Sequence, residues 1–560
     1  MNTKTSAQKS SGTQSDTAFG PSGLRSLHAR SHDAWRSPGR FTKNPDLVRM
    51  PEGRLIFIYS DNDRHWSQET QVLTLVASDD SGTSWFKLSE IISADLRKGD
   101  ERLVTPRLSL LSDGRLVALI DHDDFGHFHQ EQPLGHWIFF SSDGGMTWTR
   151  PVVPDIRGFE PDRVVEFPDG TLAVVSQYMR ADSQEFAVAL STSSDGGATW
   201  KEIATIAHDG YHRYCEGALV ILDRGAKGKE LACVMRENHC TGIPSLVSFS
   251  QDWGRTWTAP AMCPFAIHRP YAKQLPDGRV LVTGRHVNGQ VGCVAWSGDL
   301  HAEAGQAQIG GPRSADLAQL TPDALVIGNS PDKRACRYSI LPPESHASEI
   351  VFEARLKIAD GIPGKAVAVM SLCKLMTFRS IPVMLSIGPD FICVGNPEAD
   401  SMKAVDMTTY RTITMLHRRG LLTIAVDGKP IINQCVMREE FILSEWFSED
   451  PNRRTMFGNA WDAGTSHWQS ISYRCINPTQ PDYAWSWRVE DGRYPNDYQI
   501  RRLLHLHGNP PGIDHVLDLG YSSWVVMPEG DIVFVDYSSQ GDPPAKSHIV
   551  GLRFAPGEIP

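Results

Sequence analysis

Short apolar runs, each interrupted by a turn of Asp-Gly or Glu-Gly type, recur along most of the chain. Such a turn between alternating apolar segments predicts a β-hairpin. Five of the hairpins are compact, and a sixth, between Gly217 and Met235, has a longer turn. The five compact segments are LVRMPEGRLIFI around Gly53, LSLLSDGRLVAL around Gly114, VVEFPDGTLAVV around Gly170, AKQLPDGRVLVT around Gly278 and WVVMPEGDIVFV around Gly530.

A second repeat, the octet S-x-D-x-G-x-x-W, lies between the hairpins. Its four copies occupy residues 78–85, 141–148, 193–200 and 250–257, and their Asp residues are 63, 52 and 57 positions apart. This composition predicts a tight turn: Asp accepts backbone N–H groups, Gly allows positive φ, and Trp folds back as an apolar plug. Four copies at nearly constant spacing indicate a repeat architecture.

Six hairpins, four of them followed by an octet, predict six four-stranded units. Radial repetition of such units forms a β-propeller. We therefore expect an all-β fold, a six-bladed β-propeller over residues 31–306 and 477–560, preceded by a disordered leader at residues 1–30. The hairpin repeat is absent from residues 307–476, where alternating strands predict an inserted antiparallel β-sandwich of jelly-roll type.

The octets resemble the Asp boxes of the sialidase (neuraminidase) superfamily, also called BNR repeats, over most of residues 33–306 and 477–560. The strand that ends in Asp427-Gly428-Lys429 resembles concanavalin and laminin-G domains, which implies that type of sandwich for the insert. Asp boxes lie in outer turns away from the active site of that superfamily. They therefore imply the fold rather than the reaction.

Composition narrows the classes of partner. The 560 residues carry a net charge of −11, which disfavours a nucleic-acid binder, and no run of about 18 apolar residues predicts a membrane span. The first 20 residues are polar and lack the apolar core of a signal peptide, so the expected location is cytoplasmic, or secreted or periplasmic if a signal was removed. The ten cysteines show no metal-binding spacing, and we expect free thiols, no metal and no cofactor.

Charged residues cluster where the hairpin strands of a propeller would converge on one mouth. Such a density of charge exceeds what a core tolerates unless the groups are paired or functional. The candidates from this argument are Arg40, Lys43, Asp61, Asp63, His65, His122, Arg180, Glu216, Arg236, Arg269, Arg285 and Tyr521.

The resemblance to sialidases assigns roles within this set. Tyr521, in the segment Gly520-Tyr521-Ser522, matches the nucleophile, and Glu216 matches the carboxylate that activates it. Arg236 and Arg285 match two arginines that bind the substrate carboxylate, whereas Lys43 replaces the third arginine, with Arg40 nearby. Asp63 or Asp61 matches the general acid, and His65 is an alternative from outside the family pattern. Arg180, Arg269 and His122 are further substrate-binding candidates.

Three functions follow from these residues. The first is an exo-acting retaining glycosidase that releases a terminal acidic sugar from an oligosaccharide or glycoconjugate, with tyrosine as nucleophile. The second is a lyase that cleaves a uronate-containing glycan by β-elimination, with Tyr521 and His65, His122 or His127 as acid and base. The third is a glycan-binding propeller without catalysis. The oligomeric state is left open.

Overall fold

The computed structural model describes residues 18–19, 23–123, 135–180, 185–239, 242–289, 292–376, 379–395, 402–437, 440–441, 454–508, 518–539 and 546–560. Strands dominate this part of the chain, so the all-β expectation is confirmed. Two short helices occur, α1 (Leu300–Glu303) and α2 (Asp497–Arg502), together with single 3₁₀ turns. No helix in the described ranges is long and apolar enough to cross a membrane.

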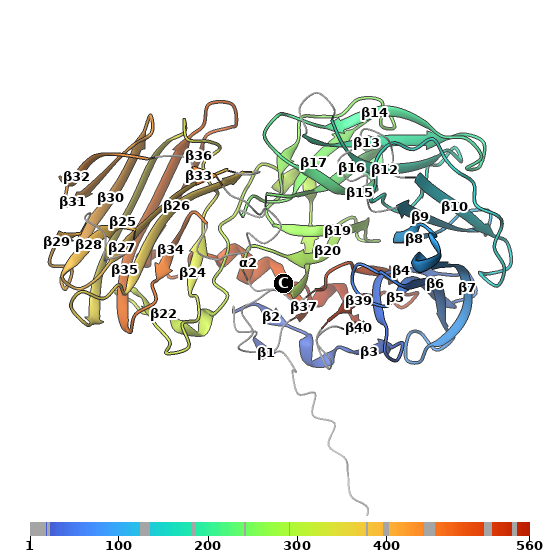
Figure 1. The fold of residues 1–560 in the computed structure, drawn as a ribbon, viewed down its shortest axis with the longest axis horizontal. Coiled ribbons are helices and arrows are strands. Elements are labelled where there is room, and N and C mark those ends of the chain that lie inside the picture. The colour runs from blue at the N-terminus through green and yellow to red at the C-terminus, as the bar shows by residue number, and fades with distance from the viewer. Residues whose placement is uncertain are drawn as a thin grey trace, which may run out of the picture.

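Six smaller sheets occupy the right-hand part of Figure 1 and account for most of the strands outside residues 307–502 in the described ranges. They are β4–β7 (Phe41–Arg49, Leu55–Asn62, Thr70–Ser78, Phe86–Asp95); β8–β10 (Arg102–Leu110, Leu116–Asp123, Gly135–Ser141); β11–β14 (Val165–Glu166, Leu172–Met179, Phe186–Ser193, Lys201–Ala207); β15–β18 (Tyr214–Asp223, Lys229–Glu237, Leu246–Ser250, Ala261–Met262); β19–β21 with β37, β2 and β1 (Ile267–Gln274, Val280–His286, Gly292–Gly298, Leu503–Gly508, Arg25–Ser26, Ala18–Phe19); and β38–β40 with β3 (Ser523–Val526, Ile532–Ser538, His548–Phe554, His32–Trp35).

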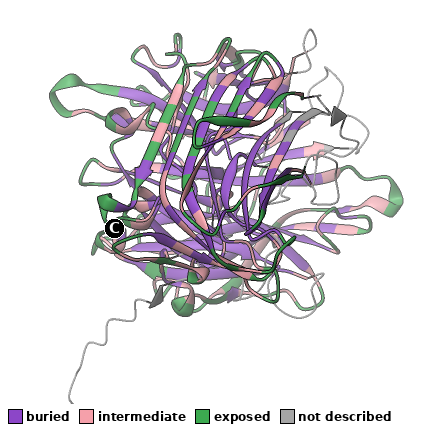
Figure 2. Ribbon diagram, turned by 90° about the vertical axis from the view of Figure 1, so that its left-hand side faces the viewer, coloured by how far each residue is buried: buried purple, intermediate pink, exposed green. Residues whose placement is uncertain are grey.

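Every hairpin expected from the sequence is present as an antiparallel pair of adjacent strands. The pairs are β4–β5, β8–β9, β11–β12, β15–β16, β19–β20 and β38–β39. The turn glycines that the pattern singled out, such as Gly53 and Gly278, have positive φ angles of 104° and 89°. Exposure is concentrated in turns and loops, whereas the strands of the smaller sheets are largely buried (Figure 2).

Two of the smaller sheets are completed by segments that are distant in sequence. Strand β37, about 200 residues after β21, pairs with it, and β3 near the N-terminus pairs with β40 near the C-terminus. Strand β2 adds to β37 in parallel, and both Leu24 and Leu27 are buried. Residues 24–27 are therefore part of the folded structure, whereas the sequence placed them in a disordered leader.

The four octets form similar turns, but among the described residues Trp85 of the first copy lacks the Nε1 hydrogen bond that the other three tryptophans make. In the third copy, the Asp195 carboxylate accepts hydrogen bonds from Ser193 Oγ (2.7 Å), the Thr199 N–H (2.9 Å) and Thr199 Oγ1 (2.6 Å). Trp200 Nε1 donates to the Gly197 carbonyl (3.1 Å), and Gly197 has a φ of 96°. The predicted roles of Asp, Gly and Trp in this turn are therefore confirmed.

Replacing Asp195 with alanine is expected to lower the melting temperature at neutral pH and to leave activity unchanged, because it removes three hydrogen bonds from a surface turn. The hydrogen bonds, chiefly from Thr199, lower the pKa of Asp195 to about 2 from an ordinary value of 3.8. The stabilisation is therefore complete above pH 3.8 and is lost as the pH falls toward 2. The difference in melting temperature between the two proteins should shrink over this range; a constant difference would contradict this account.

Two larger sheets lie on the left of Figure 1. One contains β22 (Ala318–Leu320), β23 (Leu325–Gly328), β25 (Glu349–Gly361), β30 (Arg411–Arg418), β31 (Leu421–Val426), β32 (Lys429–Val436), β35 (Gly464–Ile476) and β36 (Tyr483–Arg488). The other contains β24 (Arg337–Ser339), β26 (Ala368–Met376), β27 (Arg379–Ile387), β28 (Phe391–Val394), β29 (Lys403–Ala404), β33 (Glu440–Phe441) and β34 (Met456–Asn459).

These two larger sheets share one hydrophobic core. Phe352 and Trp468 from the first sheet cluster with Met370 and Phe457 from the second, and all four are fully buried. Strand β36 pairs with β35, so the first sheet continues past residue 476, where the sequence placed the end of the insert.

Candidate active site

A backbone irregularity recurs near the start of the first strand of the smaller sheets. Non-glycine residues there have positive φ angles, which are uncommon and cost roughly 1–3 kcal/mol each. In four of the sheets a β-bulge in the strand register accompanies them. Bulges re-aim side chains and are frequent beside active sites. The residues are Asn44 (φ 55°), Thr105 (49°), Glu160 (47°), Glu216 (45°) and Arg269 (50°), with Gly520 (98°) at the matching place before β38.

Side-chain acceptors satisfy the backbone N–H groups at several of these positions. This arrangement ties each irregular residue to a neighbouring strand and fixes the direction of its side chain. The bonds are Glu160 N–H to Asp121 Oδ2 (2.6 Å), Glu216 N–H to Gln177 Oε1 (2.5 Å), Arg269 N–H to Glu216 Oε2 (3.0 Å) and Gly520 N–H to Asp536 Oδ1 (3.1 Å).

The Glu216 carboxylate lies at the centre of the site. Tyr521 Oη donates a hydrogen bond to Glu216 Oε1 at 3.1 Å, although the two residues are 305 positions apart. Arg236 Nη1 lies 2.9 Å from both carboxylate oxygens. Burial alone would raise the pKa of Glu216, but the Arg236 and Arg269 charges outweigh it and hold this pKa well below its ordinary value. Glu216 is therefore an ionised acceptor for the Tyr521 proton.

Tyr521 is a neutral phenol in this environment. Burial, followed by the nearby Glu160 and Glu216 carboxyls, raises its pKa well above the ordinary value. The Arg269 guanidinium lies 5.1 Å from the centre of the Tyr521 ring and opposes that shift. Tyr521 would therefore need a base to become a nucleophile, and Glu216 is in place to act as one.

Glu160 forms a coupled carboxyl pair with Glu216. Burial and the Glu216 charge raise the pKa of Glu160 to about 8, and a side-chain hydrogen bond joins the two groups. Two carboxyls at such short range do not both ionise readily. Glu160 is therefore protonated at neutral pH, while Glu216 carries the charge.

A second group of charges surrounds Asp518. This carboxylate pairs with His65 Nδ1 and accepts a hydrogen bond from Tyr537 Oη, and Arg285 Nη2 lies 3.8 Å from its Oδ1. Arg285 Nε also donates to the Leu519 carbonyl at 2.6 Å. The rings of Tyr537 and Tyr521 are 5.9 Å apart, so the Asp518 group adjoins the Glu216 group.

Lys43 is buried and belongs to the same region. Its Nζ lies 4.8 Å from the centre of the Trp66 ring. Burial lowers the pKa of Lys43 to about 8, and attraction to Asp518 and Glu160 partly offsets that effect. The structure thus brings together Lys43, His65, Glu216, Arg236, Arg269, Arg285 and Tyr521 from the predicted set.

Asp63 does not fit the predicted role of general acid. Its carboxylate accepts hydrogen bonds from Ser67 Oγ, from the backbone N–H groups of Gln68 and Glu69 (3.1 Å each) and from Arg64 Nε (2.8 Å). Burial opposes ionisation, but these donors hold the pKa of Asp63 far below its ordinary value. Asp63 therefore remains ionised and organises the turn over residues 63–69.

Arg40 and Asp61 form an ion pair with each other. Arg40 Nε lies 2.6 Å from Asp61 Oδ1, and its remaining nitrogens donate to the Asp61 carbonyl and to two oxygens of Thr70. Ser37 Oγ donates to the other oxygen of the Asp61 carboxylate at 2.6 Å. This network joins the end of β5 to the start of β6, and a role of either residue toward a substrate stays a prediction.

His122 pairs with a residue outside the Glu216 and Asp518 groups. His122 Nδ1 pairs with Glu101, and its ring stacks on Trp137 at 4.2 Å. Arg180 follows β12, where its backbone N–H donates to the Glu185 carbonyl at 2.8 Å, and a substrate contact by its side chain stays a prediction. His127 lies outside the described residues.

Sequence reasoning omitted Glu160, Asp518 and Tyr537 from the chosen site. The sequence contains a pattern that could have identified Glu160. Like three of the other irregular residues, it stands directly before a proline: the pairs are Asn44-Pro45, Thr105-Pro106, Glu160-Pro161 and Arg269-Pro270. Four residue–proline pairs at equivalent places in the repeat mark the positions where the strand is bulged. The positions of Asp518 and Tyr537 at the ends of the last hairpin also predicted that they lie at the mouth, although neither was chosen as a site residue.

Comparison with known proteins gives one family match and one curated relative. Residues 25–208 match the BNR repeat-like domain. A sialidase from Micromonospora viridifaciens is 28% identical over 217 residues, which cover 34% of this chain and 33% of the relative. The chain thus matches about a third of the length of that relative.

Solved structures give more distant similarities. The Hadza microbial sialidase Hz136 has a TM-score of 0.38 at 18% identity, covering 48% of this chain and 58% of that one. The α-L-arabinanase of Penicillium chrysogenum, solved with arabinobiose, has a TM-score of 0.38 at 15% identity, covering 48% and 82%. The family match and the curated relative support the resemblance to the sialidase superfamily that the four octets indicate.

Proposed function

We propose that this protein is an exo-acting glycoside hydrolase of sialidase type, which releases a terminal acidic sugar with retention of configuration. The observation that supports this most strongly is the hydrogen bond from Tyr521 Oη to the ionised Glu216 carboxylate. A tyrosine beside a base is the alternative nucleophile found among glycosidases that do not use two carboxylates.

The reaction would proceed in two displacements. Glu216 takes the Tyr521 proton as the phenolic oxygen attacks the anomeric carbon, and the bond to the leaving oxygen breaks. His65, whose Nδ1 pairs with the Asp518 carboxylate, would donate a proton to that oxygen. Water then attacks the same carbon, His65 takes a proton from it, and Tyr521 recovers its own proton from Glu216. His65 thus takes the role of acid that Asp63 does not fit.

The charge of the site supports an anionic sugar. The cationic groups outnumber the ionised carboxylates below pH 8, because Glu160 is then protonated. A site with net positive charge attracts and orients a carboxylate-bearing substrate, and arginine suits carboxylates through its planar array of donors. The cations are Lys43, Arg236, Arg269 and Arg285, and the ionised carboxylates are Glu216 and Asp518.

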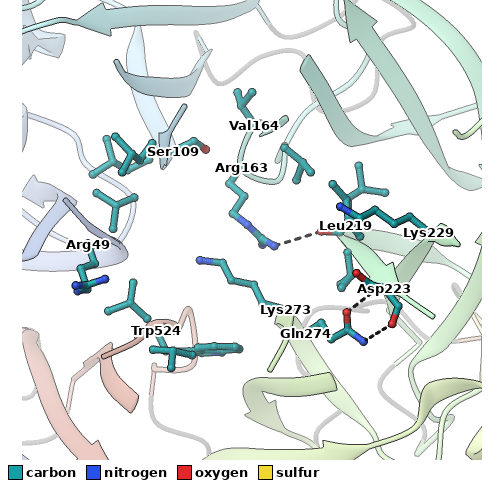
Figure 3. A pocket seen from close by; sticks show the side chains of 18 residues that line it. Arg49, Ser109, Arg163, Val164, Leu219, Asp223, Lys229, Lys273, Gln274 and Trp524 are labelled. Atoms are coloured by element: carbon teal, nitrogen blue, oxygen red, sulfur yellow. Dashed lines mark hydrogen bonds between the residues drawn. The ribbon is translucent and has the colours of Figure 1, made fainter. Parts of the chain in front are cut away.

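We further propose that the six smaller sheets are the blades of a six-bladed β-propeller and that the two larger sheets form an inserted β-sandwich. In support, residues near the first strand of each smaller sheet line one central cavity, seen from close by in Figure 3. The pairing of β3 with β40 would close such a ring between the two ends of the chain. The larger sheets lie in sequence between β21 and β37, which pair with each other.

Substrate screening tests the proposed activity. The protein is incubated with sialosides and with uronate-terminated oligosaccharides, and both free sugar and ultraviolet absorbance are followed. Release of a terminal acidic sugar without new absorbance is the expected result. New absorbance would signify the unsaturated product of a lyase, and an absence of turnover on both substrate classes would favour a glycan-binding protein.

One observation favours a lyase as the second candidate. The pairing of His65 with Asp518, close to Arg285, would provide a base beside a cation that could neutralise a uronate carboxylate. β-Elimination needs both of these groups and an acid for the leaving oxygen, for which Tyr521 is available. The ultraviolet assay separates this candidate from hydrolysis.

Activity is expected to fall as the pH rises through about 8. Ionisation of Glu160, whose pKa burial and Glu216 raise to about 8, would place a second negative charge beside Glu216 and weaken substrate binding. Lys43 loses its charge over the same range. The measurement is kcat/KM against pH for the wild type, Glu160→Gln and Lys43→Arg. Glu160→Gln should weaken the alkaline decline; an unchanged decline in both variants would contradict this assignment.

A further inference from the structure

A cavity of about 590 Å³ lies at the other end of the strands that carry the candidate active site. It is lined from all six smaller sheets, by residues such as Val48, Leu108, Val164, Leu219 and Trp524. In each smaller sheet, the lining residue of the first strand comes about four residues after the position with positive φ. At about 3.3 Å per residue, the cavity is about 13 Å from those positions along the strands.

Positive charge dominates the polar part of this cavity. Figure 3 shows Arg163 and Lys273 directed toward its centre from opposite sides. Arg49 and Lys229 also line it, and Asp223 is the acidic residue of the lining. The chain as a whole has a net charge of −11, so this cationic lining contrasts with the overall charge.

The Arg163 guanidinium is held firmly in place. Its Nη2 donates to the carbonyls of Leu219 (3.2 Å) and Ala272 (2.8 Å), and its Nη1 lies 3.5 Å from Asp162. The Asp162 carboxylate also accepts the Leu219 N–H at 3.0 Å. Arg163 is therefore a fixed cation at the wall of the cavity.

Lys273 has no comparable partner. Its ammonium lies 4.9 Å from the centre of the Tyr271 ring and 5.9 Å from that of Trp524. In the part of the chain that the structure describes, no carboxylate lies within 4.0 Å of this ammonium. The nearby Arg49 Nε is buried and likewise lacks a hydrogen-bond partner. Lys273 is half-buried and points into the cavity, where a ligand could supply the acceptor.

We propose that this cavity binds an oxyanion, the carboxylate or phosphate group of a small molecule, between Lys273 and Arg163. The apolar residues of the lining would contact the body of such a molecule, as is usual in ligand pockets. The site is separate from the Glu216 and Asp518 groups, and its occupancy does not depend on the proposed hydrolase activity.

Binding should be linked to pH. Burial and the Arg163 charge lower the pKa of Lys273 to about 7, and the Asp46 and Asp162 charges partly oppose this. The charge of Lys273 is therefore present below pH 7 and lost above it. A bound anion would raise this pKa, so binding should take up a proton near neutrality and weaken as the pH rises.

Competitive acylation of lysines tests the proposal on the intact protein. A lysine with a lowered pKa reacts readily with an amine-acylating reagent, and peptide mass spectrometry reports the extent at each position. Inorganic phosphate and acetate are added separately at constant ionic strength. We expect at least one of them to slow acylation of Lys273 about tenfold, while acylation of the exposed Lys87 is unaffected. Protection by phosphate or by acetate would identify which oxyanion the cavity prefers.

A substitution provides the second arm. Lys273→Met should weaken binding of the protecting anion at least about tenfold by calorimetry, whereas Lys87→Met, at a surface ion pair with Glu90, should not. The proposal would be overturned if neither anion slowed acylation of Lys273 in the wild type, or if all lysines were protected equally. If Lys273→Met fails to fold, the acylation experiment on the wild type still tests whether the cavity binds an anion.

Discussion

Replacing Tyr521 with phenylalanine is expected to lower kcat/KM for the preferred glycoside by at least about a thousandfold, since removal of a nucleophile has effects of this size or larger. The substitution deletes one oxygen atom. It keeps the ring that packs against the Arg269 guanidinium, and Glu216 keeps its hydrogen bonds from Arg236 and Arg269. The loss should therefore appear in kcat, with the melting temperature little changed.

Tyr483→Phe is the matched control for this experiment. Tyr483 lies in one of the larger sheets, and its hydroxyl is buried with no hydrogen-bond partner among the described residues, so its removal should affect neither activity nor folding. If Tyr521→Phe retained turnover comparable to Tyr483→Phe, the assignment of Tyr521 as nucleophile would be wrong.

Glu216→Gln is expected to have the second large effect. It removes the base that accepts the Tyr521 proton, and loss of such a base lowers the rate roughly a hundredfold to ten-thousandfold. It also leaves Arg236 facing a neutral amide in a buried position, and breaking a buried ion pair costs about 3–5 kcal/mol. Activity and the free energy of unfolding should therefore both fall, measured by steady-state kinetics and denaturant titration.

Glu230→Gln separates these two effects. Glu230 is a buried carboxylate near the start of β16, whereas Arg236 lies near the end of that strand. Glu230 pairs with His301 and Arg224. Its substitution should lower stability without changing kcat in the folded protein. Equal losses of kcat in both variants would show that the effect of Glu216→Gln comes from destabilisation rather than from the missing base.

The local repeats carry most of the predictable part of the fold. The turn of each compact hairpin and the Asp, Gly and Trp positions of the octets are set by interactions within a few residues, and all of them appear in the structure as expected. The pairing of Tyr521 with Glu216 also agrees with the sequence, because each lies at the start of a repeat and the repeats place those starts at one end.

Long-range pairings explain what the sequence missed. Strand β37 pairs with β21 across the segment that contains both larger sheets, and β2 joins it, which is why residues 24–27 are part of the folded structure. No local sequence pattern predicts which distant strands pair with each other. The prediction for Asp63 was limited in a similar way. Its position in the sequence suggests a general acid, but its carboxylate accepts hydrogen bonds from Ser67 and Glu69 in the turn that it organises.

Charged residues lie at both ends of the first strands of the smaller sheets. At one end of the inner strands, Glu216 and Asp518 each hold an arginine close to the proposed reaction centre. At the other end, Arg163 is fixed by Asp162 and Lys273 lacks a carboxylate partner among the described residues. The same strands thus carry paired charges near the candidate active site and, at the other end, a lysine without a carboxylate partner among the described residues.

The most direct test of the proposed mechanism is to trap the covalent intermediate. A fluorinated glycosyl fluoride of the preferred acidic sugar, which slows breakdown of the glycosyl-enzyme, is incubated with the wild type, and the protein is digested for peptide mass spectrometry. The account predicts one sugar attached to the peptide that contains Tyr521, and no label in Tyr521→Phe. A label on a carboxylate such as Glu216 or Asp518, or inversion of configuration in the first product, would contradict it.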